Sequence, residues 1–484
     1  MIFELEPKLV FKYFDEILKI PRPSKKEEKI ISYLEDFAKE QKLEIQKDKA
    51  GNIVIRKAAC KGYENRKSVV LQSHVDMVCE KNADVKHDFM KDPVPAYIDG
   101  DWIKAKGTTL GADNGIGVAT QLALLADKSI EHGPIECLFT IDEETGLTGA
   151  FMLKENMIKS KILINLDSED EGEIFIGCAG GVDTLIDLPL KYKKTANNQV
   201  AFNIKLSGLK GGHSGDDINK GYANSNLLLF RLLLNLSKKY AIGLSDFQGG
   251  NLRNAIPREA EATIVVKNKL VEKLKSTVKE YEQVIKSEFA TTEPELKLKV
   301  TETKLPKEIL KNSVFKKLIY SVYSCPNGVI SMSQDVEGLV ETSTNLASIK
   351  IIMKTAHIVT SQRSSVETAK TDIADRIKCN FNLAGAKVKH TESYPGWTPN
   401  TNSEILGIAT NAYKKLFGKD AKVKAIHAGL ECGLFLEKYP YLDMISIGPT
   451  MRGVHSPDER LQVSTVDMYW KFLLQILKDV PDEK

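Results

Sequence analysis

Five short stretches of the sequence place histidine or carboxylate side chains at the ends of apolar runs. They are His74 and Asp76 in SHVDM, Asp113 in LGADNGIG, Glu143 and Glu144 in TIDEETG, Asp167 in LINLDSE, and His455 in GVHSPDE. Imidazole and carboxylate groups together suit zinc, manganese or cobalt, whereas calcium takes oxygen ligands. Carboxylates gathered at one place repel one another unless cations lie between them. The five stretches together predict a site for divalent cations.

Each stretch has a simpler explanation when it is taken alone. Asp113 could be an N-cap, because an aspartate side chain accepts hydrogen bonds from the first amides of a helix. Asp167 leads the acidic run DSEDEGE and could begin an exposed loop, and His74 could be a hydrogen-bonded histidine of the core. The doublet Glu143–Glu144 could simply be exposed. The joint occurrence of all five stretches favours the metal site over these separate explanations.

The spacing within two of the stretches fits a hydrolytic metal site. His74 and Asp76 lie two residues apart in the apolar run VVLQSHVDMV, so they share one face of a strand and lie side by side. Glu143 and Glu144 are adjacent and point in different directions, so one can bind metal while the other acts as a general base. Two metals roughly 3.5–4 Å apart would need one bridging carboxylate and would hold a water for hydrolysis.

The elements that must position these side chains alternate between helix and strand. Helical spacing marks residues 28–40 and 115–127, and apolar runs predict strands at 53–57, 69–78, 135–141 and 161–167. This order predicts an α/β sheet with a substantial parallel component. Ligands of open α/β sheets bind beyond the carboxyl ends of the strands, where the candidate residues lie.

The pattern changes near residue 195. After the polar connector LKYKKTANNQ, the segment VAFNIKLSG at 200–208 alternates strictly, as in a strand with one buried and one exposed face. SYPGWTP at 393–399 is a second break, and the α/β pattern then resumes. The sequence therefore predicts a discontinuous α/β domain, a mixed sheet flanked by helices, formed by residues 1–195 and 396–484. An α+β lid domain, residues 196–395, is inserted into it.

The composition of the chain limits which binding partners and which cellular compartment are expected. The 484-residue chain is 42% hydrophobic and 27% charged, with a net charge of +3 and no basic tract interleaved with aromatics, so neither nucleic acid nor a membrane is expected as a partner. Its seven cysteines form no CxxC pair, which disfavours both a disulfide framework and a thiolate zinc site. The N-terminus lacks a signal-peptide pattern, and the apolar stretch LLLFRLLLNL is too short to span a membrane. A reduced cytoplasmic protein is expected.

The motifs also resemble a known family. They are SHVDM, GTTLGADNGIG, DEETG, NLDSEDEGE, GCAGG, GLKGGHSG, NLRNAIPRE, HAGLECG and GPTMRGVHSPDE. In order and spacing, over essentially the whole chain, they resemble the dinuclear zinc metallopeptidase family that includes aminoacylases, tripeptidases and carnosinases. HAGLECG and GTTLGADNGIG are specific to its dipeptidase branch.

The resemblance implies a complete set of metal ligands and two divalent ions per chain. Zinc is expected, with cobalt and manganese as alternatives. His74 and Asp167 would hold one ion, Glu144 and His455 the other, and Asp113 would bridge both.

The resemblance also implies the catalytic roles. Glu143 would be the general base that activates a metal-bridging water, and Asp76 would orient His74 and fix its tautomer. The peptide bond between Asp113 and Asn114 would be cis. The implied reaction is hydrolysis of unblocked dipeptides of broad Xaa-Xaa type, Xaa-His included.

Four residues outside the metal site would complete the substrate site. By resemblance, His213 stabilises the oxyanion, in relatives often from the other subunit, and Asn254 and Arg363 hold the substrate, with Arg363 on its terminal carboxylate. Gly429 would allow a close backbone approach. Without the family, His213 would be a surface histidine in a glycine-rich loop and Arg363 an exposed strand-end arginine. A homodimer through the lid is also implied, and the alternating strand at 200–208 would permit an edge-to-edge contact.

Alternative functions differ in substrate or in chemistry. A tripeptidase or an N-acyl amino acid hydrolase of the same family would use the same metal site. A two-metal phosphatase would need further cationic side chains, and Arg363 is its only candidate. A non-catalytic metal-binding protein would not need Glu143. In HAGLECG, His427 and Glu431 are expected to have structural roles.

Overall fold

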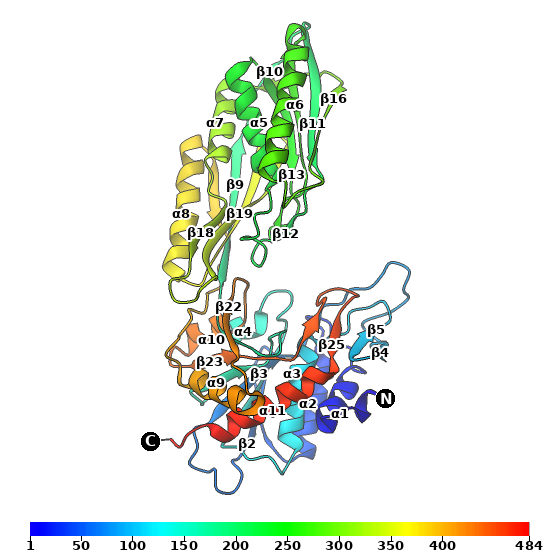
Figure 1. The fold of residues 1–484 in the computed structure, drawn as a ribbon, viewed down its shortest axis with the longest axis vertical. Helices are drawn as coiled ribbons and strands as arrows, with labels where there is room; N and C mark the ends of the chain where they lie inside the picture. Colours follow the sequence, from blue (N-terminus) through cyan, green and yellow to red (C-terminus); the bar gives the residue numbers. More distant parts are fainter. Residues whose placement is uncertain (484) are drawn as a thin grey trace. The chain divides into compact units, whose positions relative to one another are not determined.

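The computed structural model describes residues 1–483, which form two compact units (Figure 1). The first unit contains Met1–Gly177, Trp397–Ala425 and the chain from Leu430 onward. The second contains Cys178–Gly396 and Ile426–Gly429. The units divide after Gly177 because the next strand, β9 (Gly180–Pro189), is paired within the sheet of the second unit. The domain boundary predicted at residues 195 and 196 lies beyond this strand.

An eight-stranded mixed sheet forms the centre of the first unit, in the order β1-β2-β6-β3-β7-β23-β8-β22. Its strands are β1 (Glu44–Lys47), β2 (Ile53–Lys57), β3 (Val69–His74), β6 (Ile135–Thr140), β7 (Ile162–Asn165), β8 (Glu173–Cys178), β22 (Lys422–Ile426) and β23 (Asp443–Ser446). The neighbours β6, β3, β7 and β23 are parallel to one another. Every residue of β3, β6 and β7 is buried, as expected for parallel strands covered on both faces.

Helices cover this sheet. Among residues 1–483, no helix has the length and hydrophobicity of a membrane span. The helices are α1 (Lys8–Ile17), α2 (Glu28–Glu40), α3 (Ala112–Ala126), α4 (Thr148–Met152), α9 (Glu404–Phe417), α10 (Cys432–Lys438) and α11 (Val463–Asp479), after a short 3-10 helix at Ile2–Glu4. The helical spacing predicted for residues 28–40 is that of α2, whose buried positions include Ile30, Leu34 and Phe37. The buried faces of α1, α2, α3, α9 and α11 share one apolar core with the sheet.

A small four-stranded sheet lies in the same unit, in the order β24-β25-β5-β4. Its strands are β4 (Ala96–Asp99), β5 (Trp102–Ala105), β24 (Met451–Arg452) and β25 (Arg460–Gln462). The turn between β24 and β25 carries His455, whose φ of 60° is in the left-handed region.

The second unit is an antiparallel sheet with four helices. The sheet follows the order β16-β11-β15-β13-β19-β20-β9-β21, and β18 pairs with β19. Its strands are β9 (Gly180–Pro189), β11 (Gln199–Ser207), β13 (Gly243–Gly249), β15 (Ala260–Lys267), β16 (Lys297–Thr303), β18 (Gly328–Met332), β19 (Val340–Ile352), β20 (Thr355–Ser364) and β21 (Lys387–His390). Short pairs join β10 (Tyr192–Lys194) to β17 (Glu308–Leu310) and β12 (Gly212–His213) to β14 (Ala255–Ile256). The helices are α5 (Ser225–Lys239), α6 (Val271–Glu288), α7 (Asn312–Tyr323) and α8 (Glu367–Ala384), and a 3-10 helix spans Asn268–Leu270.

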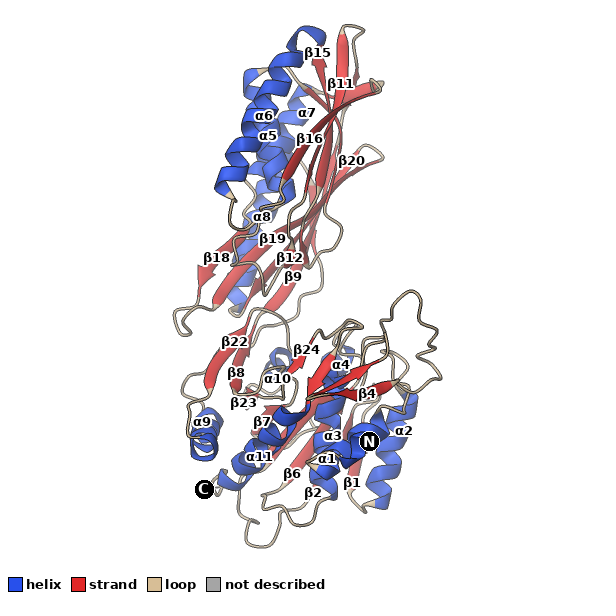
Figure 2. Ribbon diagram, turned by 45° about the vertical axis from the view of Figure 1, so that its right-hand side comes forward, coloured by secondary structure: helices blue, strands red, loops and turns tan. Residues whose placement is uncertain are grey.

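The helices of the second unit share one apolar core with its sheet, and Figure 2 shows α5, α6 and α7 along one side of the strands. Strand β11 has the alternation that the sequence predicts: Phe202, Ile204 and Leu206 are buried, and their neighbours Asn203 and Lys205 are more exposed. The structure does not leave this strand open for the edge-to-edge contact that the sequence would permit. β11 is hydrogen-bonded to β15 on one side and to β16 on the other, so its backbone groups are already paired.

Candidate metal centre

The predicted ligands meet because parallel strands bring their carboxyl ends to one edge of the sheet. His74 is the last residue of β3, Glu143 and Glu144 follow β6, and Asp167 follows β7. His455 comes from the β24–β25 turn, which follows β23 along the chain. Segments far apart in the sequence therefore converge on the first turn of α3, which carries Asp113.

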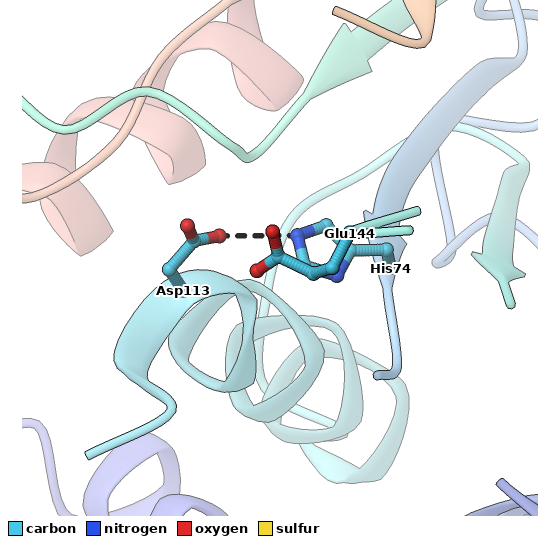
Figure 3. A group of neighbouring side chains, drawn as sticks. All are labelled: His74, Asp113 and Glu144. Atoms are coloured by element: carbon cyan, nitrogen blue, oxygen red, sulfur yellow. Dashed lines mark hydrogen bonds and ion pairs between the residues drawn. The ribbon is translucent and has the colours of Figure 1, made fainter. Parts of the chain in front are cut away.

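The carboxylate of Asp113 lies between the two histidines. Its Oδ1 is 3.0 Å from Nε2 of His74, and its Oδ2 is 3.1 Å from Nε2 of His455. Figure 3 shows Asp113 at the start of its helix, pointing toward His74 on β3 and Glu144. His74 Nε2 also lies 3.5 Å from Oδ1 of Asp167, and His455 Nε2 lies 2.9 Å from Oε2 of Glu144. The five side chains thus form two groups that share Asp113.

Asp76 supports this arrangement from the segment after β3. It is fully buried, and its Oδ1 lies 3.3 Å from Nδ1 of His74, on the ring edge opposite Asp113. The same carboxylate accepts the backbone N–H groups of Glu143 at 3.0 Å and Glu144 at 3.2 Å, and the hydroxyl of Ser24 at 2.8 Å. One side chain therefore fixes both the His74 ring and the glutamate doublet.

Asp113 is not the N-cap of its helix. The N-cap position is Gly111, and Asp113 has non-helical backbone angles (φ −82°, ψ 109°). The peptide between Asp113 and Asn114 is cis, which confirms that expectation. The Asn114 side chain donates a hydrogen bond to Oδ1 of Asp167. The Asp113 carboxylate is turned away from the helix amides and toward the histidines.

The pKa values reflect a crowded group of buried acids. Burial raises the pKa of Glu143 well above its usual range, against the opposing charge of His74. Burial opposes ionisation of Asp113 as well, but hydrogen bonds from His455 and His74 hold its pKa well below its usual value. Hydrogen bonds to Asp113 and Glu144 raise the pKa of His455 to about 11. Positive charge on the two imidazoles thus stabilises the ionised form of Asp113.

The donor set fits a divalent cation. Two imidazoles and three carboxylates are the ligand types of zinc, manganese or cobalt sites. His74, Asp113 and Glu144 can each offer one ligand atom, and these atoms all lie within 4.8 Å of one another. The buried Oε1 of Glu144 has no hydrogen-bond partner among residues 1–483. A cation would supply the charge and the partner that these oxygens need.

The remaining predicted site residues all belong to the second unit. Asn254 and Arg363 line a cavity of about 110 Å³, and Arg363 Nη1 donates to the hydroxyl of Tyr394 at 3.2 Å. A Cβ built on Gly429 would lie 3.0 Å from the same tyrosine ring, so this glycine leaves room beside it. His213 Nδ1 lies 3.2 Å from a carboxylate oxygen of Asp216.

Three residues at these sites are missing from the sequence-based predictions. Glu459 accepts hydrogen bonds from four backbone amides at the start of α3, and Arg22 donates to the backbone carbonyl oxygens of Asp76 and Gly111. Tyr394 contacts Arg363. The signal for Glu459 was its place in GVHSPDE, four residues after His455. Arg22 gives no sequence signal, because a single arginine between two prolines has no periodicity.

The chain belongs to peptidase family M20/M25/M40, whose model matches residues 70–479. Family members are hydrolases that act on peptide bonds. This confirms the predicted family and fold class.

Two full-length relatives carry more specific names. The chain is 45% identical to the cytosol non-specific dipeptidase of Escherichia coli (strain K12), over 99% of each chain. It is 42% identical to the aminoacylhistidine dipeptidase of Vibrio alginolyticus, with a TM-score of 0.93 over 100% of this chain and 99% of the other. A tripeptidase from Staphylococcus aureus has a TM-score of 0.57 over 98% of this chain and 99% of its own, but at 15% identity it shares the fold alone.

Proposed function

We propose that the protein is a metal-dependent dipeptidase that hydrolyses unblocked dipeptides, Xaa-His among them. The observation that carries the proposal is the Asp113 carboxylate, which presents one oxygen to each histidine of a five-ligand group. The two relatives above 40% identity are both named dipeptidases, which supports this substrate class over a tripeptidase or an N-acyl amino acid hydrolase.

Two ions, with zinc expected first and cobalt or manganese as alternatives, would share Asp113. His74 and Asp167 would complete one set of ligands, and Glu144 and His455 the other. When bound, the ions would polarise the scissile carbonyl and lower the pKa of the attacking water. Asp76 beside Nδ1 would keep the His74 ring in place and fix its tautomer.

Glu143 is the proposed general base. The Asp76 carboxylate accepts a hydrogen bond from the backbone N–H of Glu143, which fixes the position of Glu143 after β6. Burial raises the pKa of the Glu143 carboxyl group. A carboxyl group with a raised pKa is suited both to accept a proton from the attacking water and to donate it to the leaving amine.

The second unit would hold the rest of the substrate. Arg363 would bind the terminal carboxylate through its guanidinium, with Tyr394 fixing one of its nitrogens and Asn254 lining the same cavity. His213 would stabilise the oxyanion of the tetrahedral intermediate. Gly429 would let a substrate approach its backbone.

We further propose that residues 196–395 act as a lid and dimerisation domain, and that the protein is a cytoplasmic homodimer. The strand β18, paired on one side with β19, exposes Val329, Ile330 and Met332. An exposed apolar strand of this kind is a surface on which another chain can pair. The name of the Escherichia coli relative supports the compartment.

The test is hydrolysis of glycyl-histidine by protein stripped of metal with a chelator and then titrated with zinc, manganese or cobalt. Activity that appears on metal addition and saturates near two ions per chain supports the proposal. Glu143→Gln should bind the same number of ions and lose about 10²–10⁴-fold in kcat, because it lacks the proton acceptor. The exposed Glu155→Gln is the matched control.

Two outcomes would contradict parts of the proposal. Metal binding with hydrolysis of tripeptides or N-acyl amino acids, but not of dipeptides, would replace the substrate class. A Glu143→Gln protein with near-normal kcat would remove Glu143 as the general base.

A further inference from the structure

Arg22 is a buried charge that has no carboxylate partner among the hydrogen bonds of residues 1–483. It lies before α2 and is 1% exposed. Its Nη1 donates to the carbonyl oxygens of Val75 at 3.0 Å and Asp76 at 2.7 Å, and its Nη2 donates to the carbonyl oxygen of Gly111. A buried guanidinium is retained only where its N–H groups are satisfied. Arg22 therefore joins the segment after β3 to the segment before α3.

Glu459 is a second buried ionisable side chain at the same place, and it is 3% exposed. Its Oε2 accepts the N–H groups of Leu110 at 2.7 Å and Gly111 at 2.9 Å, and its Oε1 accepts those of Ala112 at 2.7 Å and Asp113 at 3.3 Å. The first amides of a helix have no partner within the helix, and a carboxylate there also matches the helix dipole. Glu459 thus caps α3 from a distant part of the chain.

Gly111 is held from both sides by these two residues. Its N–H donates to Glu459, and its carbonyl oxygen accepts from Arg22. Its φ of 71° favours glycine, and a Cβ at this position would lie 2.7 Å from Arg22 Nη2. A Cβ on Gly115 would lie equally close to the same nitrogen. Two glycines of LGADNGIG thus make room for the guanidinium.

The capping by Glu459 decides what Asp113 can do. An aspartate at the start of a helix usually accepts hydrogen bonds from the helix amides with its own side chain. Here those amides are already satisfied by Glu459, so both Asp113 oxygens are free to face the two histidines. Arg22 fixes the same segment relative to Asp76, which contacts His74.

We propose that Arg22 and Glu459 are positioning residues that hold Leu110–Asp113 in place, and with it the carboxylate shared by the two groups of metal ligands. This inference rests on the proposed function for its metal site. It adds that the affinity of this site for its metal ions depends on two residues, Arg22 and Glu459, that contact neither the metal nor the substrate. Residues that orient metal ligands typically change metal affinity about 10–100-fold when they are replaced.

The experiment measures zinc dissociation constants by competition with a chromophoric chelator, for Glu459→Gln and Arg22→Met. Each should weaken zinc binding about 10–100-fold, and excess zinc should restore much of kcat with little change in KM. The double variant should lose less than the product of the two single losses, because both act on one segment. If Arg22→Met does not fold, Arg22→Lys replaces it, since lysine keeps the charge but lacks the fork of donors.

The matched controls are Glu136→Gln and Arg56→Met in the same unit. Glu136 is also buried and accepts the backbone amides of Lys159 and Ser160, and it pairs with Arg56. It lies in β6, toward the strand end opposite the glutamate doublet. These variants should lose stability and keep the wild-type zinc affinity.

The outcomes separate the inference from the proposed function. Zinc affinities of Glu459→Gln and Arg22→Met equal to those of the controls would overturn the inference, even if the wild-type protein cleaves dipeptides. Weakened zinc binding in both variants would support it, even if the wild-type protein cleaves no dipeptide. A wild-type protein that binds no zinc, manganese or cobalt would overturn both.

Discussion

At the scale of single residues, burial keeps His427 uncharged. The sequence motifs assign this histidine a structural role and no catalytic one. His427 of HAGLECG is 6% exposed, and its Nε2 lies 2.7 Å from the hydroxyl of Ser343. Burial first, and the positive charge of Arg363 second, lower the pKa of His427 to about 4. In the folded protein this histidine is therefore neutral at pH 7 and also at pH 5.

This lowered pKa predicts acid sensitivity. In the unfolded chain His427 takes up a proton near pH 6.5, whereas in the folded protein it does so only near pH 4. Its contribution to stability is present above pH 6.5 and is lost as the pH falls toward 4. When the pH is lowered from 7 to 4.5, the free energy of unfolding of the wild-type protein should fall by about 2–3 kcal/mol more than that of His427→Gln. Urea unfolding at the two pH values measures this difference. A wild-type protein that loses no more unfolding free energy than His427→Gln over this range would refute the assignment.

At the scale of elements, α3 keeps a residue of low helix propensity, Gly117, where it packs against the candidate metal centre. A Cβ on Gly117 would lie 1.9 Å from Oδ1 of Asn114 and 3.0 Å from the carbonyl oxygen of Leu166. Asn114 in turn donates to Asp167. The glycine is needed because the helix and the ligand segment after β7 approach closely here.

Two glycine-to-alanine substitutions separate propensity from packing. In the middle of an exposed helix, alanine is more favourable than glycine by up to about 1 kcal/mol. A Cβ added to Gly407 in α9 would meet no other atom of residues 1–483 within 4 Å, so Gly407→Ala should stabilise the protein by about that amount. Gly117→Ala should instead destabilise it by about 1–3 kcal/mol through overpacking. Urea unfolding of both variants measures the two changes in stability. Stabilisation by Gly117→Ala would contradict the close approach of α3 to the segment after β7.

At the scale of the whole molecule, the proposed metal ligands come from distant parts of one compact unit. His74 and His455 are separated by most of the chain, yet both contact Asp113. The unfolded chain cannot hold these ligands together, so metal binding favours the folded unit. At a free metal concentration of 100 times the dissociation constant, the gain is about 2.7 kcal/mol for each site.

Hydrogen exchange should locate this gain. Added zinc should slow amide exchange in β3, at the start of α3 and in the β24–β25 turn, because opening these segments would release the metal. In the absence of substrate, peptides from β13 and β15 of the second unit should exchange at unchanged rates. Asp113→Asn should remove most of the zinc effect, since it weakens the shared ligand. Equal protection in both units, or none, would contradict a site confined to the first unit.

The sequence by itself determined the local elements and the types of ligand. Apolar periodicity located α2, most of α3 and the buried strands, since burial demands apolar residues at fixed spacing. The predicted ligands could be named because few residue types bind divalent metals. The strand predicted over 69–78 ends at His74, however, so Asp76 reaches the His74 ring from the segment after β3 and not through the period of a strand.

Only the tertiary structure decided how those residues are held. Both the Asp113 orientation and the pairing of β11 depend on groups far away in the sequence: Glu459 for the first, β15 and β16 for the second. Glu459 and Arg22 bind backbone amides and carbonyls, which nearly all residues possess. No pattern of side chains in the sequence therefore predicts their partners. Local sequence specifies which groups a segment offers, whereas long-range packing specifies which of them remain free to meet a ligand.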